Sequence, residues 1–293
     1  MSEQPLVSVI LPSFNHRRYV DESIQSVLQQ TYSNIQLIVI DDGSTDGSAD
    51  YIAELAGQHG FEYIAQANVG LITTLNRAKQ RVRGKYVSFS ASDDFYHSQK
   101  IERLVIFLEK HPEYAMVHSK IIHVDDQSKE TRRIDEYCPS GQVFGALLRG
   151  DFHVNGLSAM VRADVYSQFQ YGQFYIDDWY MWLRIAEKFP VGHVDEYLAY
   201  YRRHDNHLSG KADKMMAAEK SILDCFTYAP DYTEAVLRWH EKWFNYFASQ
   251  QDPASRAQAL VLGRELLLQQ RWSSPFFKGW ARWLWTATRA VSS

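Results

Sequence analysis

Residues 6–42 decide the fold of this chain and read LVSVILPSFNHRRYVDESIQSVLQQTYSNIQLIVIDD. The apolar, β-branched run over residues 6–11 ends at Pro12, which predicts a buried strand. Apolar residues then recur at helical spacing over residues 19–28, and residues 35–40 form a second apolar run. A strand, a helix and a second strand in this order predict a parallel pair joined by a helical crossover.

The same alternation continues to residue 93. Residues 51–57 and 71–82 suit helices, and residues 61–64 and 85–92 suit strands. We therefore predict an α/β fold with a mixed, mainly parallel sheet that carries helices on both faces.

Beyond residue 100 the pattern is less regular. It predicts a helix over residues 101–108, a strand over 115–124, a polar loop over 125–142, an apolar segment over 156–161 and a helix that starts near Asp164. After Asn206 only helical spacing remains, so we place a domain boundary near residue 210. The sequence thus predicts one domain over residues 1–210 and a helical C-terminal region over residues 211–293.

The composition restricts the classes of function. Hydrophobic residues make up 45% of the 293 positions and charged residues 23%, which is typical of a globular protein. The formal net charge of −4 gives no reason to expect binding of nucleic acid. There is no signal-peptide pattern, and no apolar run reaches the ~18 residues of a membrane span, so we expect a cytoplasmic protein. Cys138 and Cys225 have no His or Cys at metal-binding spacing and are interpreted as free thiols.

Polar residues follow three of the predicted strands at their carboxyl ends. They are the turn Pro12-Ser13-Phe14-Asn15, the pair Asp41-Asp42 and the pair Asp93-Asp94. In open α/β sheets, ligands bind outside the carboxyl ends of the strands. We therefore expect these three turns to meet along one crevice.

The acidic pairs in these turns allow two interpretations each. Asp93 and Asp94 favour a bound Mg²⁺ or Mn²⁺, because these cations take oxygen ligands, whereas the alternative is a solvated turn. Asp42 can accept a hydrogen bond from the ring N–H of a nucleobase. The alternative assigns this cluster, with Ser44 and Thr45, to capping of the next helix.

Two further polar clusters occur later in the chain. Asp177-Asp178 opens a predicted helix, where Asp178 is either a general base near the cleft or a favourable charge at a helix N-terminus. The segment from residue 201 to 207 contains Arg202 and His204. Its cations and imidazoles can grip a diphosphate and His204 can ligate a metal, although a lone His is more often structural.

In order and spacing, these motifs resemble one family, the inverting glycosyltransferases of family 2 with the GT-A fold, over about residues 5–210. The resemblance rests on VSVILPSFN (7–15), VLQQTY (27–32), IDDGSTD (40–46), Asn68-Val-Gly70, Asn76, Gly84-Lys-Tyr86, Asp93-Asp94, Asp177-Asp178 with Arg184, and Tyr201-Arg-Arg-His204.

The resemblance implies a role for each matching residue. It implies that Asp42 meets the uracil of the donor, that Asp93 lies near the ribose and diphosphate, and that Asp94 ligates the cation. Asp178 matches the general base, and His204 matches the histidine of the late motif, as a donor contact and metal ligand. The remaining positions implied to bind the nucleotide sugar are Pro12, Ser13, Phe14, Asn15, Asn68, Gly70, Asn76 and Arg202.

Two positions depart from the family pattern. Many relatives have a further Asp two residues before Asp93, where this chain has Ala91. Many also have Arg just before the residue that matches Asn76, where this chain has Leu75.

The resemblance implies an inverting transferase, dependent on Mn²⁺ or Mg²⁺, that moves a hexose from a nucleoside diphosphate sugar, UDP-linked, to an acceptor. Residues 1–98 would bind the donor and residues 99–210 the acceptor. That acceptor would be a saccharide or a saccharide on a polyprenyl diphosphate, in the synthesis of a surface polysaccharide such as O-antigen or capsule. The rival interpretations are a catalytically inactive protein that binds sugar nucleotides or acts as a scaffold, and a nucleotidyltransferase.

The C-terminus predicts an amphipathic helix that begins at Ser274-Pro275. Its apolar face contains Phe276, Phe277, Trp280, Trp283, Leu284 and Val291, and its other face contains Lys278, Arg282 and Arg289. This pattern suits either a helix in the interface at the inner face of the cell membrane or a helix that docks on the catalytic domain.

Overall fold

The computed structural model describes residues 4–175, 178–204, 212–269 and 272–290, the last four of these by their backbone only. The chain divides into two compact units, one of residues 1–144 and 152–210, the other of residues 145–151 and 211–293. The short segment 145–151 therefore belongs with the C-terminal helices, which no pattern in the sequence indicated. The assignment of residues 1–98 to the donor and 99–210 to the acceptor stays a prediction.

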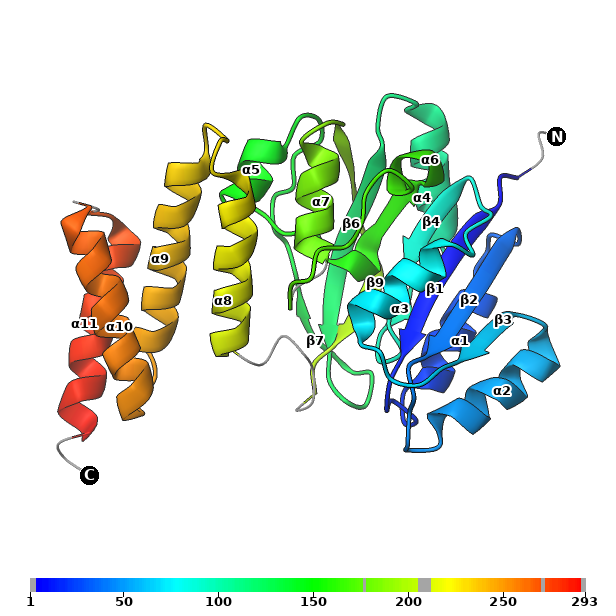
Figure 1. Cartoon of the computed structure of the whole chain (residues 1–293), viewed down its shortest axis with the longest axis horizontal. Helices are drawn as coiled ribbons and strands as arrows, with labels where there is room; N and C mark the ends of the chain where they lie inside the picture. Colours follow the sequence, from blue (N-terminus) through cyan, green and yellow to red (C-terminus); the bar gives the residue numbers. More distant parts are fainter. Residues whose placement is uncertain (1–3, 176–177, 205–211, 270–271, 291–293) are drawn as a thin grey trace. The chain divides into compact units, whose positions relative to one another are not determined.

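The described strands of the first unit form one nine-stranded sheet (Figure 1). The strand order is β3-β2-β1-β4-β8-β6-β9-β5, and β7 pairs with β6. The strands are β1 (Val7–Ser13), β2 (Ile35–Asp41), β3 (Glu62–Ala65), β4 (Tyr86–Phe89), β5 (Phe95–Tyr96), β6 (Met116–Val124), β7 (Glu130–Arg133), β8 (Ala159–Arg162) and β9 (Val191–Arg202).

The N-terminal half of the sheet is parallel, as the alternating pattern predicts. β1 pairs with β2 from Val7↔Ile35 to Ser13↔Asp41, and β4 lies on the other side of β1. Gly84 permits the close approach of β4, because a Cβ at this position would lie 2.6 Å from the backbone nitrogen of Ser8. The turns after β1, β2 and β4 therefore leave the sheet at the same edge.

The other half of the sheet is mixed. β8 is antiparallel to both β4 and β6, and β5 is antiparallel to β9. The start of β8 and the end of β9 consequently join the carboxyl edge of β4. A 3₁₀ helix, η1 (Gly156–Ser158), precedes β8 and lies at this edge.

Three strands of this half, β5, β7 and β9, were not predicted. β5 has only two residues, which is too short for a recognisable alternation. β7 lies inside residues 125–142, and all four of its residues are exposed and polar, so no apolar alternation marks it. β9 contains the exposed pair Asp195-Glu196, and its pairing with β6 shifts register near Lys120, so its pattern is interrupted.

Helices cover both faces of the sheet. Apolar residues of α1 (Val20–Leu28), α2 (Ser48–His59) and α4 (Lys100–Lys110) share a core with Val7, Val9 and Leu11 of β1. On the opposite face lie α3 (Leu71–Lys79), α6 (Ala163–Tyr166) and α7 (Asp178–Ala186). There the ring of Phe89 packs 5.4 Å from Tyr166 and 5.5 Å from Trp182, between ring centroids.

The described part of the second unit is helical, as predicted. Its long helices are α8 (Ala212–Leu223), α9 (Tyr232–Ala248), α10 (Pro253–Leu268) and α11 (Ser274–Ala290), with a 3₁₀ turn, η3 (Asp224–Phe226), between α8 and α9. Segment 145–151 carries most of α5 (Phe144–Leu148) and is fixed to α9 by ion pairs of Arg149 with Asp231 and of Asp151 with Arg238.

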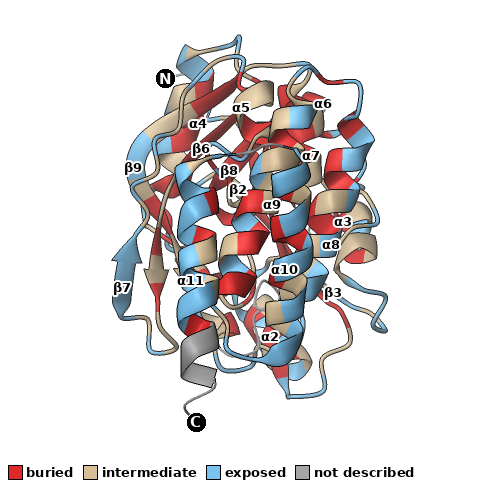
Figure 2. Cartoon of the chain, turned by 90° about the vertical axis from the view of Figure 1, so that its left-hand side faces the viewer, coloured by how far each residue is buried: buried red, intermediate tan, exposed pale blue. Residues whose placement is uncertain are grey.

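The predicted apolar face of α11 is divided in the structure. Phe276 is 2% exposed, the ring of Trp280 lies 5.4 Å from Phe244 of α9, and Trp283 Nε1 donates to the carbonyl of Arg256 in α10. Other apolar residues of α11 are exposed, and Figure 2 shows exposed residues along the outward sides of α10 and α11. Val291 lies outside the described residues, as does the side chain of Arg289. Among the described helices, none is long and apolar enough to cross a bilayer.

Candidate active site

The turns that follow β1 and β2 are joined by hydrogen bonds at the carboxyl edge of the sheet. The backbone N–H of Asn15 donates to Ser44 Oγ at 2.8 Å, and Thr45 N–H donates to Asn15 Oδ1 at 2.8 Å. Asn15 has φ 55°, a left-handed conformation that Asn tolerates better than most residues. In the same turn, Phe14 is 44% exposed and Pro12 is half-buried. Ser13 is buried, and its Oγ has no hydrogen-bond partner among the described residues.

The pair Asp41-Asp42 divides into two roles. Asp41 accepts hydrogen bonds from the backbone N–H of Ser44 at 2.9 Å and from its hydroxyl at 2.6 Å, which is the capping interpretation. Asp42 accepts from Gln66 Nε2 at 2.8 Å and from the backbone N–H groups of Val69 and Gly70 at 2.9 Å each. The segment of Asn68 to Gly70 is thus held beside Asp42. A carboxylate offers about four acceptor positions, so one remains for a nucleobase N–H.

Helix α3 begins beside this network. Asn76 Oδ1 is buried without a hydrogen-bond partner among the described residues, whereas Leu75, 5% exposed, belongs to the core. Arg77 donates to Gln66 Oε1 at 2.7 Å, and Gln66 in turn donates to Asp42. The sequence prediction missed this cation, which directly follows Asn76 in the chain and reaches the hydrogen-bond network of Asp42 through Gln66.

The carboxylates of Asp93 and Asp94 have different surroundings. Asp93 Oδ2 lies 3.0 Å from His204 Nε2, and its Oδ1 lies 3.8 Å from His16 Nδ1. Burial raises the pKa of Asp93, but the hydrogen bond with His204 and the nearby His16 outweigh it and hold that pKa below its usual value. Asp93 is therefore ionised and faces two imidazoles.

Asp94 is turned into the protein. It is 5% exposed, and its Oδ1 accepts the backbone N–H of Arg202 at 2.7 Å. Burial and the charge of Asp93 raise the pKa of Asp94 well above its usual value, in spite of this hydrogen bond. The pairing of β5 with the end of β9 places the two residues together.

The guanidinium of Arg202 is buried and donates hydrogen bonds to other parts of the protein. Arg202 is 1% exposed, and its donors reach the carbonyls of Asp93 at 2.7 Å and Asp125 at 3.0 Å. It also donates to Ser128 Oγ at 3.1 Å and to Glu22 Oε2 at 2.5 Å. These partners account for all of its N–H groups, so Arg202 does not face a ligand, and we withdraw the prediction that it binds the diphosphate.

Three side chains at this edge form a possible metal site. His16, Asp93 and His204 each offer one ligand atom, and these atoms lie within 4.8 Å of one another. Imidazole nitrogen and carboxylate oxygen are both ligands that Mn²⁺ accepts. The sequence prediction named Asp94 and His204 as metal ligands. In the structure Asp93, and not Asp94, lies with His204 in this group, since Asp94 accepts the backbone N–H of Arg202. The sequence prediction did not include His16, although it directly follows the SFN motif.

Asp178 is the first residue of α7 and is partly exposed. Its Oδ2 accepts the backbone N–H of Gly156 at 3.0 Å, and its Oδ1 accepts that of Trp179 at 2.7 Å. Because Gly156 begins η1, this contact holds Asp178 at the same edge as the turn after β4. Burial raises the pKa of Asp178, although the two backbone hydrogen bonds oppose it. Its neighbour Asp177 lies outside the described residues.

A cavity of about 380 Å³ lies at the opposite edge of the sheet. It is lined by residues at the amino ends of β2 and β3, among them Gln36, His59 and Phe61. No predicted site residue contributes to its lining, so its position does not bear on the chemistry at the carboxyl edge.

Comparison with known proteins gives a family and several relatives. The family described as Glycosyl transferase family 2 matches residues 8–169. An uncharacterized glycosyltransferase of Haemophilus influenzae is 30% identical over 224 residues, which cover 71% of this chain and 69% of the relative. The putative teichuronic acid biosynthesis glycosyltransferase TuaG of Bacillus subtilis is 28% identical, over 74% of this chain and 86% of that protein. In an uncharacterized glycosyltransferase of Rickettsia felis, 29% identical over 75% of this chain, the match spans only 37% of the relative.

Solved structures share the fold at lower identity. TarS 1–349 of S. aureus in complex with UDP-GlcNAc has a TM-score of 0.65 at 15% identity, covering 88% of this chain and 80% of that chain. The mannosyltransferase PcManGT of Pyrobaculum calidifontis, in complex with GDP-Man and Mn²⁺, has a TM-score of 0.60 at 16% identity, covering 99% and 88%. These likenesses confirm the predicted GT-A fold.

The buried contacts of Arg202 generate a prediction about stability. We expect Arg202→Met to lower the free energy of unfolding by at least about 2 kcal/mol, because each buried acceptor left without a donor costs about 1–3 kcal/mol. Arg203→Met is the matched control. Arg203 is exposed, and a surface change of this kind is expected to stay within about 0.5 kcal/mol. Urea denaturation followed by tryptophan fluorescence measures both, and equal losses in the two variants would contradict the buried role of Arg202.

Proposed function

The chain belongs to glycosyl transferase family 2, and we propose that it transfers a hexose from a nucleoside diphosphate sugar, UDP-linked, to a saccharide or lipid-linked saccharide acceptor. Membership of the family makes it a glycosyltransferase. The identity of the donor, the identity of the acceptor and inversion at the anomeric carbon are what we propose. The arrangement that carries it is the carboxyl edge of the sheet, where an ionised Asp93 faces two imidazoles and Asp178 is held with a raised pKa. The setting we propose is synthesis of a surface polysaccharide such as O-antigen, which the name of TuaG supports.

The donor side of the proposed site consists of the turns after β1 and β2 and the start of α3. Phe14 is exposed there as an apolar surface for a base, and Asp42 has an acceptor position for a ring N–H. The resemblance also implies Pro12, Ser13, Asn15, Asn68, Gly70 and Asn76, and these residues stay in the proposal. Gly70 donates its backbone N–H to Asp42, and Asn15 is bonded to the turn of Ser44. The UDP-GlcNAc bound in the TarS structure supports a UDP-linked donor.

We propose that Asp93, His204 and His16 hold a Mn²⁺ or Mg²⁺ ion. The donor set fits such an ion because the three ligand atoms converge and Asp93 is ionised. When bound, a divalent cation offsets the charge that develops on the departing diphosphate. The Mn²⁺ in the PcManGT structure supports the use of a divalent cation.

Asp178 is the proposed general base. Its carboxylate would take the proton of an acceptor hydroxyl, whose oxygen then bonds to the anomeric carbon while the bond to the nucleoside diphosphate breaks. The two backbone N–H groups of Gly156 and Trp179 fix the orientation of this carboxylate. A raised pKa makes it a stronger base than an ordinary Asp.

The base assignment predicts the effect of Asp178→Asn. We expect the rate of hexose transfer from UDP-sugars, measured by UDP release with acceptor present, to fall by about 10²–10⁴-fold, because an amide cannot accept the proton. Binding of UDP, measured by calorimetry, should be nearly unchanged. In the wild-type enzyme, kcat/KM should fall at acidic pH with an apparent pKa above the usual Asp value, because protonated Asp178 cannot act as a base.

Asp164→Asn is the control for this variant. Asp164 lies in the first turn of α6 and accepts the N–H of Val165, as Asp178 accepts that of Trp179, but it is exposed and away from the proposed site. It should retain full activity. Substantial transfer by Asp178→Asn would show that another residue is the base.

The division of the acidic pair predicts different effects of two neighbouring substitutions. Asp93→Asn should weaken Mn²⁺ binding at least about tenfold, because it removes the charged ligand. Asp94→Asn should keep Mn²⁺ affinity, because its amide oxygen still accepts the N–H of Arg202. The signal of free Mn²⁺ in electron paramagnetic resonance measures the Mn²⁺ affinity of both variants without an activity assay. Loss of binding in Asp94→Asn alone would restore the assignment made from the sequence.

We also propose that the protein lies at the inner face of the cell membrane, with α11 in contact with anionic lipid. Phe277, Leu284 and Trp285 are 56%, 58% and 55% exposed, beside the face of α11 that packs on α9 and α10. Lys278 and Arg282 are exposed and border these residues at about 100° per residue. An exposed apolar strip next to cations suits the headgroup region of an anionic bilayer.

This proposal predicts that the double variant Phe277→Asp, Trp285→Asp loses flotation with vesicles that contain phosphatidylglycerol. The wild-type chain should float with these vesicles and less with purely zwitterionic ones, because its cations then lack a partner. Tyr228→Asp is the control, since Tyr228 is 67% exposed on the same unit but lies outside α11. Equal flotation of the double variant and the wild type would exclude α11 as the contact.

A further inference from the structure

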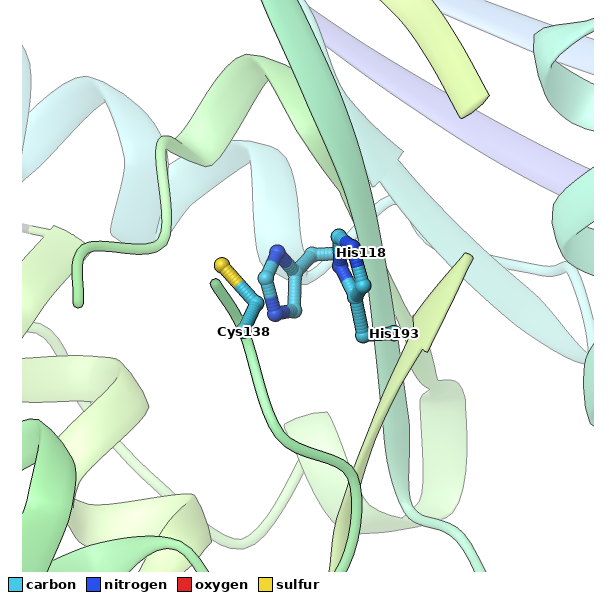
Figure 3. Close-up of side chains that lie close together, drawn as sticks. All are labelled: His118, Cys138 and His193. Carbon is cyan, nitrogen blue, oxygen red and sulfur yellow. The ribbon is translucent and has the colours of Figure 1, made fainter. Parts of the chain in front are cut away.

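A second cluster of metal-ligating side chains lies in the first unit, away from the proposed active site. It consists of His118 in β6, His193 in β9 and Cys138 in the loop that follows β7 (Figure 3). Each offers one ligand atom, and these atoms lie within 4.8 Å of one another. His193 is the third residue of β9, whereas His204 follows the end of that strand, so the two clusters lie at opposite ends of β9.

The backbone fixes all three positions. His118 and His193 are direct partners in the parallel pairing of β6 with β9, which places them side by side. The loop of Cys138 is held at both ends. Ile134 N–H donates to the carbonyl of Ile121 at 3.1 Å, and Gly141 exchanges two backbone hydrogen bonds of 2.9 Å with Val191. Cys138 is thus presented to the imidazoles by a segment that is itself bonded to the sheet.

The imidazoles carry buried atoms without partners. His118 is 1% exposed, and its Nε2 has no hydrogen-bond partner among the described residues; the same holds for His193 Nδ1. A buried polar atom left unpaired is costly, so two in one cluster require an explanation.

We propose that His118, Cys138 and His193 bind a single Zn²⁺ ion that ties the loop of Cys138 to strands β6 and β9. Two imidazoles and a thiol are a nitrogen and sulfur donor set, which selects Zn²⁺ over the oxygen-seeking Mg²⁺ and Mn²⁺. On binding, a Zn–S bond forms and the thiol proton goes to solvent, with no change of oxidation state.

The surroundings of the cluster suit a metal site. Asp195 Oδ1 lies 3.9 Å from His193 Nε2, so a carboxylate faces the ring nitrogen that is not needed as a ligand. The ring of Phe152 stacks on His118 with centroids 6.0 Å apart, which gives the site an apolar wall. The site goes beyond the proposed function, because none of these residues belongs to the donor, metal or base positions of the carboxyl edge.

Cobalt spectroscopy of the full chain tests the ligand set. Co²⁺ added to the metal-free protein should give a thiolate-to-metal charge-transfer band in the near ultraviolet, at one equivalent, and Zn²⁺ should remove it. Cys138→Ser should abolish the band. Cys225→Ser is the matched control and should retain it, because Cys225 is the other cysteine and is exposed on the second unit. Absence of the band in the wild type, or its presence in Cys138→Ser, would overturn the proposal.

Affinity and stability provide an independent test. We expect His193→Gln to weaken Zn²⁺ binding, measured in competition with a chromophoric chelator. Loss of a residue that only hydrogen-bonds to a metal ligand costs about 10–100-fold in affinity, and loss of the ligand itself should cost more. Zn²⁺ should raise the Tm of the wild type and of Cys225→Ser by more than that of Cys138→Ser, which keeps only the cluster at the carboxyl edge. Circular dichroism of each metal-free variant shows whether it is folded before metal is added. A folded His193→Gln protein with wild-type affinity would also overturn the proposal.

Discussion

The buried guanidinium of Arg202 is the interaction on which the candidate site depends. It joins the end of β9 to α1 through Glu22, to the turn after β4 through the carbonyl of Asp93, and to the β6–β7 turn through Asp125 and Ser128. A planar group with five donors in a fixed geometry can hold several acceptors at once, which Lys cannot. The backbone N–H of the same residue fixes Asp94. Because Arg202 is fixed in this way, His204, two residues further along the chain, is held beside Asp93.

Each acidic pair at the carboxyl edge contains one structural and one available carboxylate, though to different degrees. Asp41 accepts hydrogen bonds from Ser44, and Asp94 accepts one from the backbone of Arg202, whereas Asp93 faces two imidazoles. Asp42 is intermediate, because three donors already hold it to the loop of Gly70. Adjacent carboxylates at the end of a strand therefore do not share one role, since successive side chains leave the backbone in different directions.

The two ligand clusters differ in a chemically consistent way. The cluster at the carboxyl edge combines a carboxylate with imidazoles, where a diphosphate would also supply oxygen ligands. The cluster at the other end of β9 has a thiol and no carboxylate among its three members, which favours a borderline cation with a structural role. Strand β9 thus connects two candidate metal sites with different donor atoms. Its register against β6 pairs His118 with His193 in the cluster that contains Cys138.

From the sequence we could predict the α/β architecture, the parallel pairing of the first strands, the helical second unit and the edge at which the polar turns meet. Hydrophobic periodicity and turn residues are local signals, so they are readable without the fold. The tertiary structure was needed to show that Asp93 and not Asp94 faces His204, that His16 joins them, and that Arg202 is buried. It also brought Cys138 to His118 and His193, although sequence spacing had marked that cysteine as a free thiol. These pairings join residues 20 to 188 positions apart, and they are set by strand register and loop anchoring, which no local pattern encodes.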